Sequence, residues 1–219
     1  MKKIKNQKKI AITILLIILV TFFSTLKLFS EDPKSAFLKL ITEQQKSFPE
    51  TFKCQISSTI FTDYLKQLPS EAFTKPLDKV IITLEVVKGS ASIVVDGVKG
   101  DYMDFVQSYF VSYLQLINLV FLSAEELEKQ FADFTVSYEN NQFILKSEVI
   151  SYAFTFKNNL LSTVSYYQAQ VKQMDIVIIY FKSANYQLIK SITLINYSQD
   201  SSQKENTNQA IIIFSNYKY

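Results

Sequence analysis

The residue types that catalyse most reactions at neutral pH are scarce in this chain of 219 residues. The sequence contains no His, and its single cysteine is Cys54. Without His, neither a Ser-His-Asp nor a Cys-His arrangement can be assembled, and the usual neutral-pH general base is missing. An ordinary zinc site would lack its ligands as well. The sequence therefore predicts no metal site and no cofactor.

Pairs of carboxylates are the remaining candidates for acid–base chemistry. Asp101 and Asp104 lie three residues apart near the start of a predicted helix, and Glu125 and Glu126 are adjacent. Acidic residues in a first turn stabilise the positive end of a helix, and Glu126 stands three residues after Ser123, which is the spacing of a capping box. Because no spacing brings two acids into a sugar-binding cleft, we expect structural roles for all four and expect no enzyme.

Cys54 belongs to a segment with a clean alternating pattern. In Thr51–Phe61, Phe52, Cys54 and Ile56 point to one face and polar side chains point to the other. This alternation predicts a strand with one buried face. A thiol on that apolar face is expected to be an inert core side chain and not a nucleophile.

The last third of the chain reads as a run of antiparallel strands joined by short turns. Its residues are rich in Ile, Val, Thr, Tyr and Phe, which favour strands. The segments are Tyr152–Phe156, Leu160–Gln168, Asp175–Lys182, Leu188–Tyr197 and Ala210–Tyr217. Several of them are apolar on both faces, so we expect each face of the sheet to be covered by helices or to line a ligand.

Helices and further hairpins are predicted before this run. Pro33 opens an amphipathic helix that continues to about Ser47. Val80–Val87 and Ala91–Val95 are predicted strands, and Asp96-Gly97 is a strong signal for one more hairpin.

Two more helices and a hairpin complete the middle of the chain. Phe105–Leu122 has no charged residue and is interrupted by Gln, Ser and Asn, which favours a buried helix; a second membrane span is the alternative. A short helix is expected from Ser123 to about Phe131, and then a hairpin from Phe134–Tyr138 and Gln142–Glu148.

The N-terminus has the pattern of an export signal. Several lysines precede the apolar run Ile10–Phe23, which is short for a spanning helix. We expect residues 1–30 to be a cleaved signal peptide or an uncleaved anchor through residues 10–29. The positive-inside rule then places the remainder outside the inner membrane, in the periplasm, soluble or anchored. Residues 31–219 carry 17 lysines against 20 acidic residues, which argues against nucleic acid as a partner.

The order of these elements resembles the outer-membrane lipoprotein carrier family, which has the LolA/LolB-like fold. Pro33–Phe61 is similar to the opening helix and first strand of that family. Asp133–Lys146 resembles its middle hairpin, and Leu188–Tyr217 resembles its closing strands, with Ile212, Phe214 and Tyr217 as the final pattern. The chain departs from the family in having neither Arg nor Trp, residues that those carriers place near the cavity.

The resemblance implies an α+β fold for residues 31–219, with a curved antiparallel sheet forming an incomplete barrel covered by helices. It implies a non-catalytic protein of the cell envelope whose apolar cavity holds acyl chains of lipids or lipoproteins. The expected lining is Phe52, Cys54, Ile56, Ile82, Leu84, Phe105, Tyr109, Tyr113, Leu116, Phe154, Phe156, Ile178, Tyr180, Ile192 and Leu194. The alternative is a membrane-anchored structural or interaction protein with a filled core and no ligand.

Overall fold

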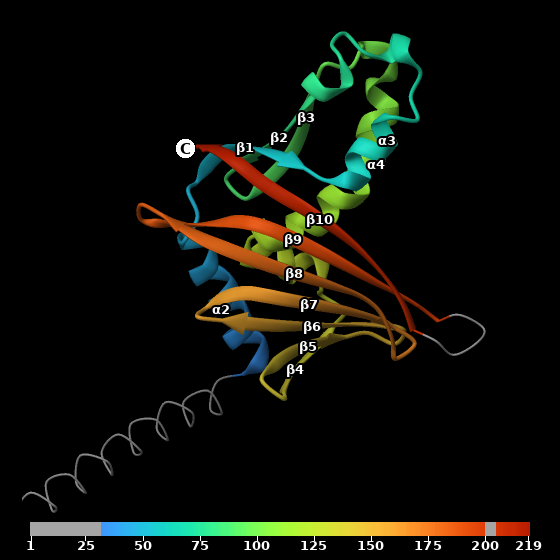
Figure 1. Ribbon diagram of the computed structural model, residues 1–219. Helices are drawn as coiled ribbons and strands as arrows, with labels where there is room; N and C mark the ends of the chain where they lie inside the picture. Colours follow the sequence, from blue (N-terminus) through green and yellow to red (C-terminus); the bar gives the residue numbers. More distant parts are fainter. Residues whose placement is uncertain (1–31, 200–204) are drawn as a thin grey trace, which may run out of the picture.

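The computed structural model describes residues 32–199 and 205–219. The predicted signal or anchor at residues 1–30 lies outside this range. The described chain is α+β, with one large curved antiparallel sheet that does not close on itself, and with helices on one side of it (Figure 1). The general architecture expected from the sequence is therefore confirmed for this part of the chain.

Ten strands form the sheet, in the order β3-β2-β1-β10-β9-β8-β7-β6-β5-β4. Every neighbouring pair is antiparallel. The strands are β1 Thr51–Ser57, β2 Ile81–Val87, β3 Ser90–Asp96, β4 Thr135–Glu139, β5 Gln142–Lys146, β6 Ile150–Lys157, β7 Leu160–Gln168, β8 Val171–Ser183, β9 Tyr186–Gln199 and β10 Glu205–Lys218. The order is sequential except that β10 pairs with β1, so the C-terminal strand joins the two halves of the sheet.

Four helices accompany the sheet in the described residues. They are α2 Pro33–Lys46, α3 Thr59–Leu65, α4 Gly100–Phe121 and α5 Ala124–Gln130, with short 3-10 helices at Ser70–Ala72 and Leu77–Lys79. In Figure 1, α2 and the C-terminal half of α4 lie behind the strands, and none of the four helices lies in front of them. We call the side toward the helices the covered face and the opposite side the open face.

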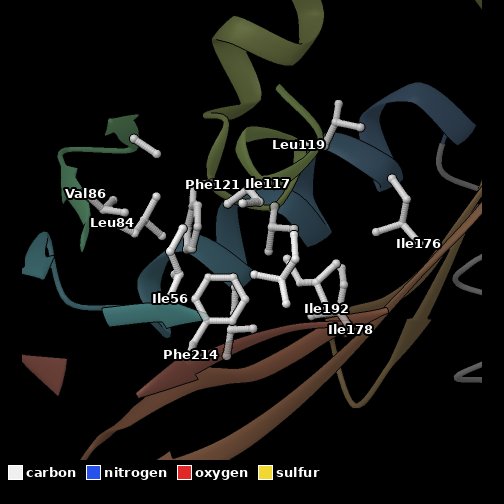
Figure 2. Packing of buried hydrophobic residues seen from close by; sticks show 14 of the residues in the cluster. Ile56, Leu84, Val86, Ile117, Leu119, Phe121, Ile176, Ile178, Ile192 and Phe214 are labelled. Atoms are coloured by element: carbon white, nitrogen blue, oxygen red, sulfur yellow. The ribbon is translucent and has the colours of Figure 1, made fainter. Parts of the chain in front are cut away.

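The covered face is built from alternate residues of every strand. Ile56 of β1 lies between Ile82 of β2 and Phe214 of β10, and in the next pair of strands Ile212 faces Ile192. These side chains are at most 8% exposed and form one cluster with helix residues such as Phe37 and Phe121. Figure 2 shows Ile56, Ile192 and Phe214 of this cluster beside Phe121. Burying aliphatic and aromatic side chains of this size stabilises a fold by roughly 1.5–3 kcal/mol each.

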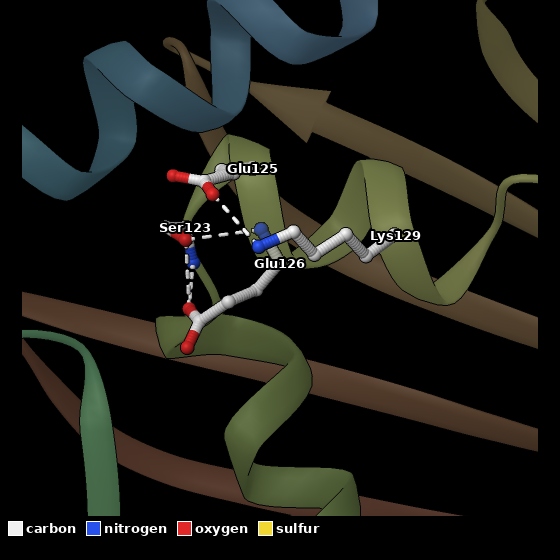
Figure 3. A network of polar contacts seen from close by, with 4 residues as sticks. All are labelled: Ser123, Glu125, Glu126 and Lys129. Atoms are coloured by element: carbon white, nitrogen blue, oxygen red, sulfur yellow. Dashed lines mark hydrogen bonds and ion pairs between the residues drawn. The ribbon is translucent and has the colours of Figure 1, made fainter.

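The helix starts follow local rules that the sequence shows. Pro33 occupies the first turn of α2, where the side chain of Asp32 accepts a hydrogen bond from the Ser35 amide at 3.0 Å. Ser123 and Glu126 form the predicted capping box at α5, and Lys129 pairs with Glu125 at 2.8 Å (Figure 3). Glu125 and Glu126 therefore both have structural roles, as expected.

Two expectations about strands are wrong. The strand predicted over Thr51–Phe61 ends at Ser57, and α3 begins at Thr59. Asp96-Gly97 does not turn into a hairpin, because the chain continues into α4 at Gly100. Gly97 has a φ of +107° and the adjoining Val98 makes an isolated bridge to Phe73, so the turn signal serves a strand-to-helix connection.

The long helix α4 has the buried character expected of Phe105–Leu122. Val106, Phe110, Ile117 and Phe121 are at most 3% exposed, whereas Gln107, Ser108 and Gln115 face solvent. None of the helices within residues 32–199 and 205–219 is both long and apolar enough to cross a bilayer.

Candidate functional site

Fourteen of the fifteen side chains predicted to line a cavity lie together in the core under the covered face. Phe52, Cys54, Ile56, Ile82, Leu84, Phe154, Ile178, Ile192 and Leu194 are buried, and Tyr109, Tyr113, Leu116, Phe156 and Tyr180 are partly buried against them. These residues pack on one another and on side chains of α2, α4 and α5. These fourteen side chains form one continuous group, as the lining of a cavity would. Side chains of the helices fill the space beside them.

Phe105 does not join this set. Its side chain is 65% exposed, although the neighbouring Val106 is completely buried. Successive residues of a helix lie about 100° apart around its axis, so Phe105 and Val106 point to different sides of α4. Because Phe105–Leu122 contains no charged residue, its sequence does not indicate which phenylalanine is exposed to solvent.

The sheet contains an opening where β7 and β8 separate. Their pairing ends at Thr163 and Val177, although β7 begins at Leu160 and β8 continues to Ser183. Figure 1 shows the two strands diverging at this end, with α2 behind the gap. Beyond Val177, β8 is paired only with β9.

Side chains satisfy the backbone of Leu161 at this opening. The Leu161 amide donates to Oε1 of Gln44 at 2.5 Å, and the Leu161 carbonyl accepts from the Tyr180 hydroxyl at 2.8 Å. Gln44 is 1% exposed and its Nε2 also donates to the Val120 carbonyl at 2.9 Å. An unsatisfied buried backbone group costs about 1–3 kcal/mol, so these contacts stabilise the separation of the strands.

The β8–β9 hairpin also separates from β10. Pairing between β9 and β10 ends at Ser191 and Ile213, and the Tyr217 hydroxyl donates to the Ile189 carbonyl at 2.6 Å. The Gln187 amide donates to the Ser47 carbonyl at 2.9 Å. Residues 180–189 therefore form a two-stranded arm that is held to its surroundings by tyrosine hydroxyls and by the end of α2.

A cleft of about 730 Å³ lies at the opening between β7 and β8. Its volume falls within the roughly 300–1,000 Å³ typical of small-molecule sites. It is lined by Glu43, Ser47, Lys157, Asn158, Asn159, Leu160, Ser162, Ile178, Ile179, Tyr180 and Gln187. Ile178 and Tyr180 belong to the covered face and Ile179 to the open face, and all three line the cleft where β7 and β8 separate.

The titrating groups near the core stay neutral at physiological pH. Burial raises the pKa of the Tyr180 hydroxyl above its usual range, and burial with the neighbouring Cys54 does the same to the pKa of Tyr217. Burial raises the pKa of the Cys54 thiol to about 12. Both tyrosines are therefore hydrogen-bond donors, and Cys54 is a protonated core thiol, as its place in the alternating strand predicts.

A smaller cleft of about 180 Å³ also lies at the C-terminal end of α2. Phe48, Phe52 and Phe121 form its apolar wall, with Lys88 and Glu50 at its edge. The Phe121 ring makes edge contacts with the other two rings, at centroid distances of 5.4 and 5.6 Å. Its volume is below the range typical of ligand sites.

A buried carboxylate lies on the open face of the sheet. Asp175 is 8% exposed and accepts hydrogen bonds from Ser165 at 2.5 Å and Tyr197 at 2.7 Å, and it pairs with Lys172 at 2.7 Å. Burial by itself would raise the pKa of Asp175, but the contacts from Lys172, Ser165 and Tyr197 lower it below its usual value. Within the described residues, no three Asp, Glu, His or Cys side chains group in a way that could hold a metal ion.

Searches of protein-family models, of curated proteins and of solved structures find no match to this chain.

Proposed function

We propose that this chain is a non-catalytic binding protein of the cell envelope that holds acyl chains of lipids or lipoproteins. The chains would lie between the covered face of the sheet and its helices. The observation that carries the proposal is the cleft between β7 and β8, because its apolar side chains Ile178 and Tyr180 belong to the same cluster as the core. An acyl chain entering the cleft would therefore meet a continuous apolar path toward the interior.

The chemistry of the cleft suits an amphipathic ligand. Leu160, Ile178 and Tyr180 supply apolar surface, and Glu43, Lys157 and the neighbouring asparagines place polar groups at the rim. Each methylene that leaves water contributes about 0.8 kcal/mol, so a long chain would bind tightly without covalent chemistry. The Tyr180 hydroxyl, which bridges the opening, would exchange the Leu161 carbonyl for water if a ligand displaced the arm.

One feature of α4 favours a second arrangement of the helices. The Asn118 Oδ1 atom is buried and has no hydrogen-bond partner within the described residues. Leaving a buried acceptor unpaired costs about 1–3 kcal/mol. Displacement of α4 by a ligand would relieve this cost and would create the volume that the filled core lacks.

A photoreactive fatty acid with a diazirine in its chain tests the proposal on the full chain. We expect adducts on the inward side chains Ile178 and Ile192, mapped to single residues by mass spectrometry. Ser162→Trp, which fills the cleft, should lower their yield several-fold. Ser137→Trp is the matched control, since both serines are part-exposed in strands, and each donates one hydrogen bond.

A second candidate function is that of an envelope interaction protein without a ligand. The close packing of the fourteen predicted lining residues against the helices favours it. Absence of adducts on inward side chains, at fatty-acid concentrations that label a bilayer-embedded control protein, would overturn the first proposal in favour of this one. The same experiment therefore decides between the two.

A further inference from the structure

One strand edge of the arm faces the cleft between β7 and β8. On β9, the Gln187 amide donates to the end of α2 and the Ile189 carbonyl accepts from a tyrosine hydroxyl of β10, so both residues direct backbone groups away from β8. Residues directly opposite in an antiparallel pair either exchange hydrogen bonds or both face outward. Their opposite residues on β8 are Lys182 and Tyr180, respectively. The amides and carbonyls of Lys182 and Tyr180 therefore face away from β9, toward the cleft.

The two walls of the cleft differ in how their backbone groups are satisfied. On β7, the side chains of Gln44 and Tyr180 bond to the amide and carbonyl of Leu161. On β8, pairing with β7 ends at Val177, and among the described residues no hydrogen bond joins the backbone of Tyr180 or Lys182 to the opposite wall. Free donors and acceptors on an extended strand are a template for pairing with another chain.

The opposite side of the arm is packed, so this free edge is held in place. Leu188 and Ile189 of β9 are each 1% exposed. The ring centroids of Phe181 in the arm and Tyr217 of β10 are 5.8 Å apart. A ligand that pairs with a preordered strand does not have to order it on binding, which favours affinity.

We propose that the cleft binds an extended peptide segment, which adds to the free edge of β8 as a short strand. Hydrogen bonds to the backbone of Tyr180 and Lys182 supply affinity, and alternate side chains of the segment supply specificity. One set of side chains lies on the open face beside Ile179 and Phe181, which are 49% and 38% exposed. The other set faces the polar part of the lining, which includes Glu43 on α2.

The lining indicates which segment fits. Lys157 lines the cleft and Lys182 lies on its edge, and both are exposed. Glu43, the only acidic residue of the lining, accepts a hydrogen bond from Asn159 at 3.2 Å. Cross-strand neighbours on the open face favour β-branched or aromatic side chains. The segment that fits best therefore alternates Val, Ile or Phe with Ser, Thr or Asp.

The outer strands of a second copy do not suit this space. β3 and β4 are each paired with a neighbouring strand on one side, so either would bring its own sheet with it. The cleft is bounded by strands on both sides, which admits a single extended segment and not the edge of a folded sheet. The inference rests on the backbone of the arm, and it stands whether or not the interior binds acyl chains.

A library of seven-residue peptides tests the proposal on the full chain. Its members alternate Val, Ile or Phe with Ser, Thr or Asp, and amide hydrogen exchange is followed by NMR. We expect the tightest peptides to slow exchange at the Tyr180 and Lys182 amides about tenfold or more. Amides of β4, which is also a free edge but borders no such cleft, are the matched control and should exchange at an unchanged rate.

The alternation of a strand gives a sharper readout. N-methylation of every second peptide residue should abolish binding in one of the two possible phases only, since one set of amides faces β8. Lys182→Pro removes an amide that does not pair with β9, and it should weaken binding about tenfold. Lys182→Ala keeps the amide and should weaken binding no more than about threefold. The N-methylated peptides need no variant, so they decide the question if Lys182→Pro does not fold.

Three results would overturn the proposal. The first is that no library member slows exchange at Tyr180 and Lys182, and the second is equal binding of the two N-methylated sets. The third is slow exchange at both amides without peptide: if it depends on protein concentration, a second copy pairs with β8, and otherwise another part of this chain does.

The peptide site and the acyl site fail separately. Peptide binding is read from amides of β8, whereas acyl binding is read from adducts on inward side chains of β8 and β9. Protection by peptide without fatty-acid adducts would leave a peptide-binding protein with a filled core. Adducts without protection would leave the acyl site and exclude the added strand.

Discussion

The two faces of strands β8 to β10 have similar side chains and opposite surroundings. Ile178, Ile192 and Ile212 are at most 4% exposed, whereas Ile179, Ile211 and Ile213 are between 47% and 49% exposed. Residues of the two sets alternate along β8 and β10. The difference comes from the helices, which cover only one face (Figure 1). Apolar composition therefore shows that a face can be buried, and the placement of other elements decides whether it is.

Truncating one isoleucine on each face gives the largest expected difference. Ile192→Ala should lower the free energy of unfolding by about 2–5 kcal/mol, because it leaves a cavity in a packed core. Ile213→Ala should change it by less than about 0.5 kcal/mol, because its side chain is half in water. Denaturant unfolding of both variants measures this, and similar losses would mean that the open face is covered in solution.

Removing the side chain of Gln44 tests how much its hydrogen bonds stabilise the packing of α2 and α4 on the covered face. Gln44→Ala leaves the Leu161 amide and the Val120 carbonyl without partners, at about 1–3 kcal/mol for each unpaired group. Gln45→Ala is the control, because its 3.3 Å contact with the Phe121 carbonyl is only part-buried. Comparable unfolding free energies for the two variants would show that Gln44 is dispensable to the separation of β7 from β8.

The open face has one buried network, and Asp175→Asn tests it. The variant should lose about 1–3 kcal/mol of stability at neutral pH, because the amide cannot accept all the bonds of the carboxylate. The folded pKa of Asp175 is lowered, so its contribution is fully present above the unfolded pKa of about 3.9 and is lost as pH falls through the folded value.

Unfolding measured at a series of pH values checks this prediction. The difference in unfolding free energy between the original protein and Asp175→Asn should become smaller on acidification below about pH 4. Asp78→Asn, at an aspartate whose side chain is 73% exposed, should show no such narrowing. If the difference in unfolding free energy does not change with pH, the negative charge of Asp175 does not contribute to stability.

The tyrosine at the opening should have the smallest effect on stability. Tyr180→Phe removes the hydrogen bond to the Leu161 carbonyl and should cost about 0.5–1.5 kcal/mol. Amide hydrogen exchange in residues 178–183 should quicken, because the arm is held less firmly. Tyr138→Phe, at an exposed ring, is the control; unchanged exchange in the arm would show that its position does not depend on this hydroxyl.

Much of the fold was predictable from the sequence. The positions of the strands, the cap of α5 and the start of α2 agree with alternation, turn residues and capping spacing, which act within a few residues. The predicted hairpin after Asp96-Gly97 does not form, because a turn signal does not specify whether a strand or a helix follows it. Of the eleven residues that line the cleft, only Ile178 and Tyr180 were expected to contact a ligand, and the opening beside them was not predicted.

The sequence by itself determined which chemistry is missing and which residues alternate. A chain without His cannot form a Ser-His-Asp or a Cys-His arrangement whatever its fold, and a period of two in the apolar pattern predicts strands. Only the tertiary structure decided which of two apolar faces receives the helices and where the sheet opens. Both depend on contacts between distant residues, such as Gln44 with Leu161, 117 positions apart. Local sequence patterns do not indicate which distant residues are in contact. The cleft between β7 and β8 could therefore be identified only in the folded chain.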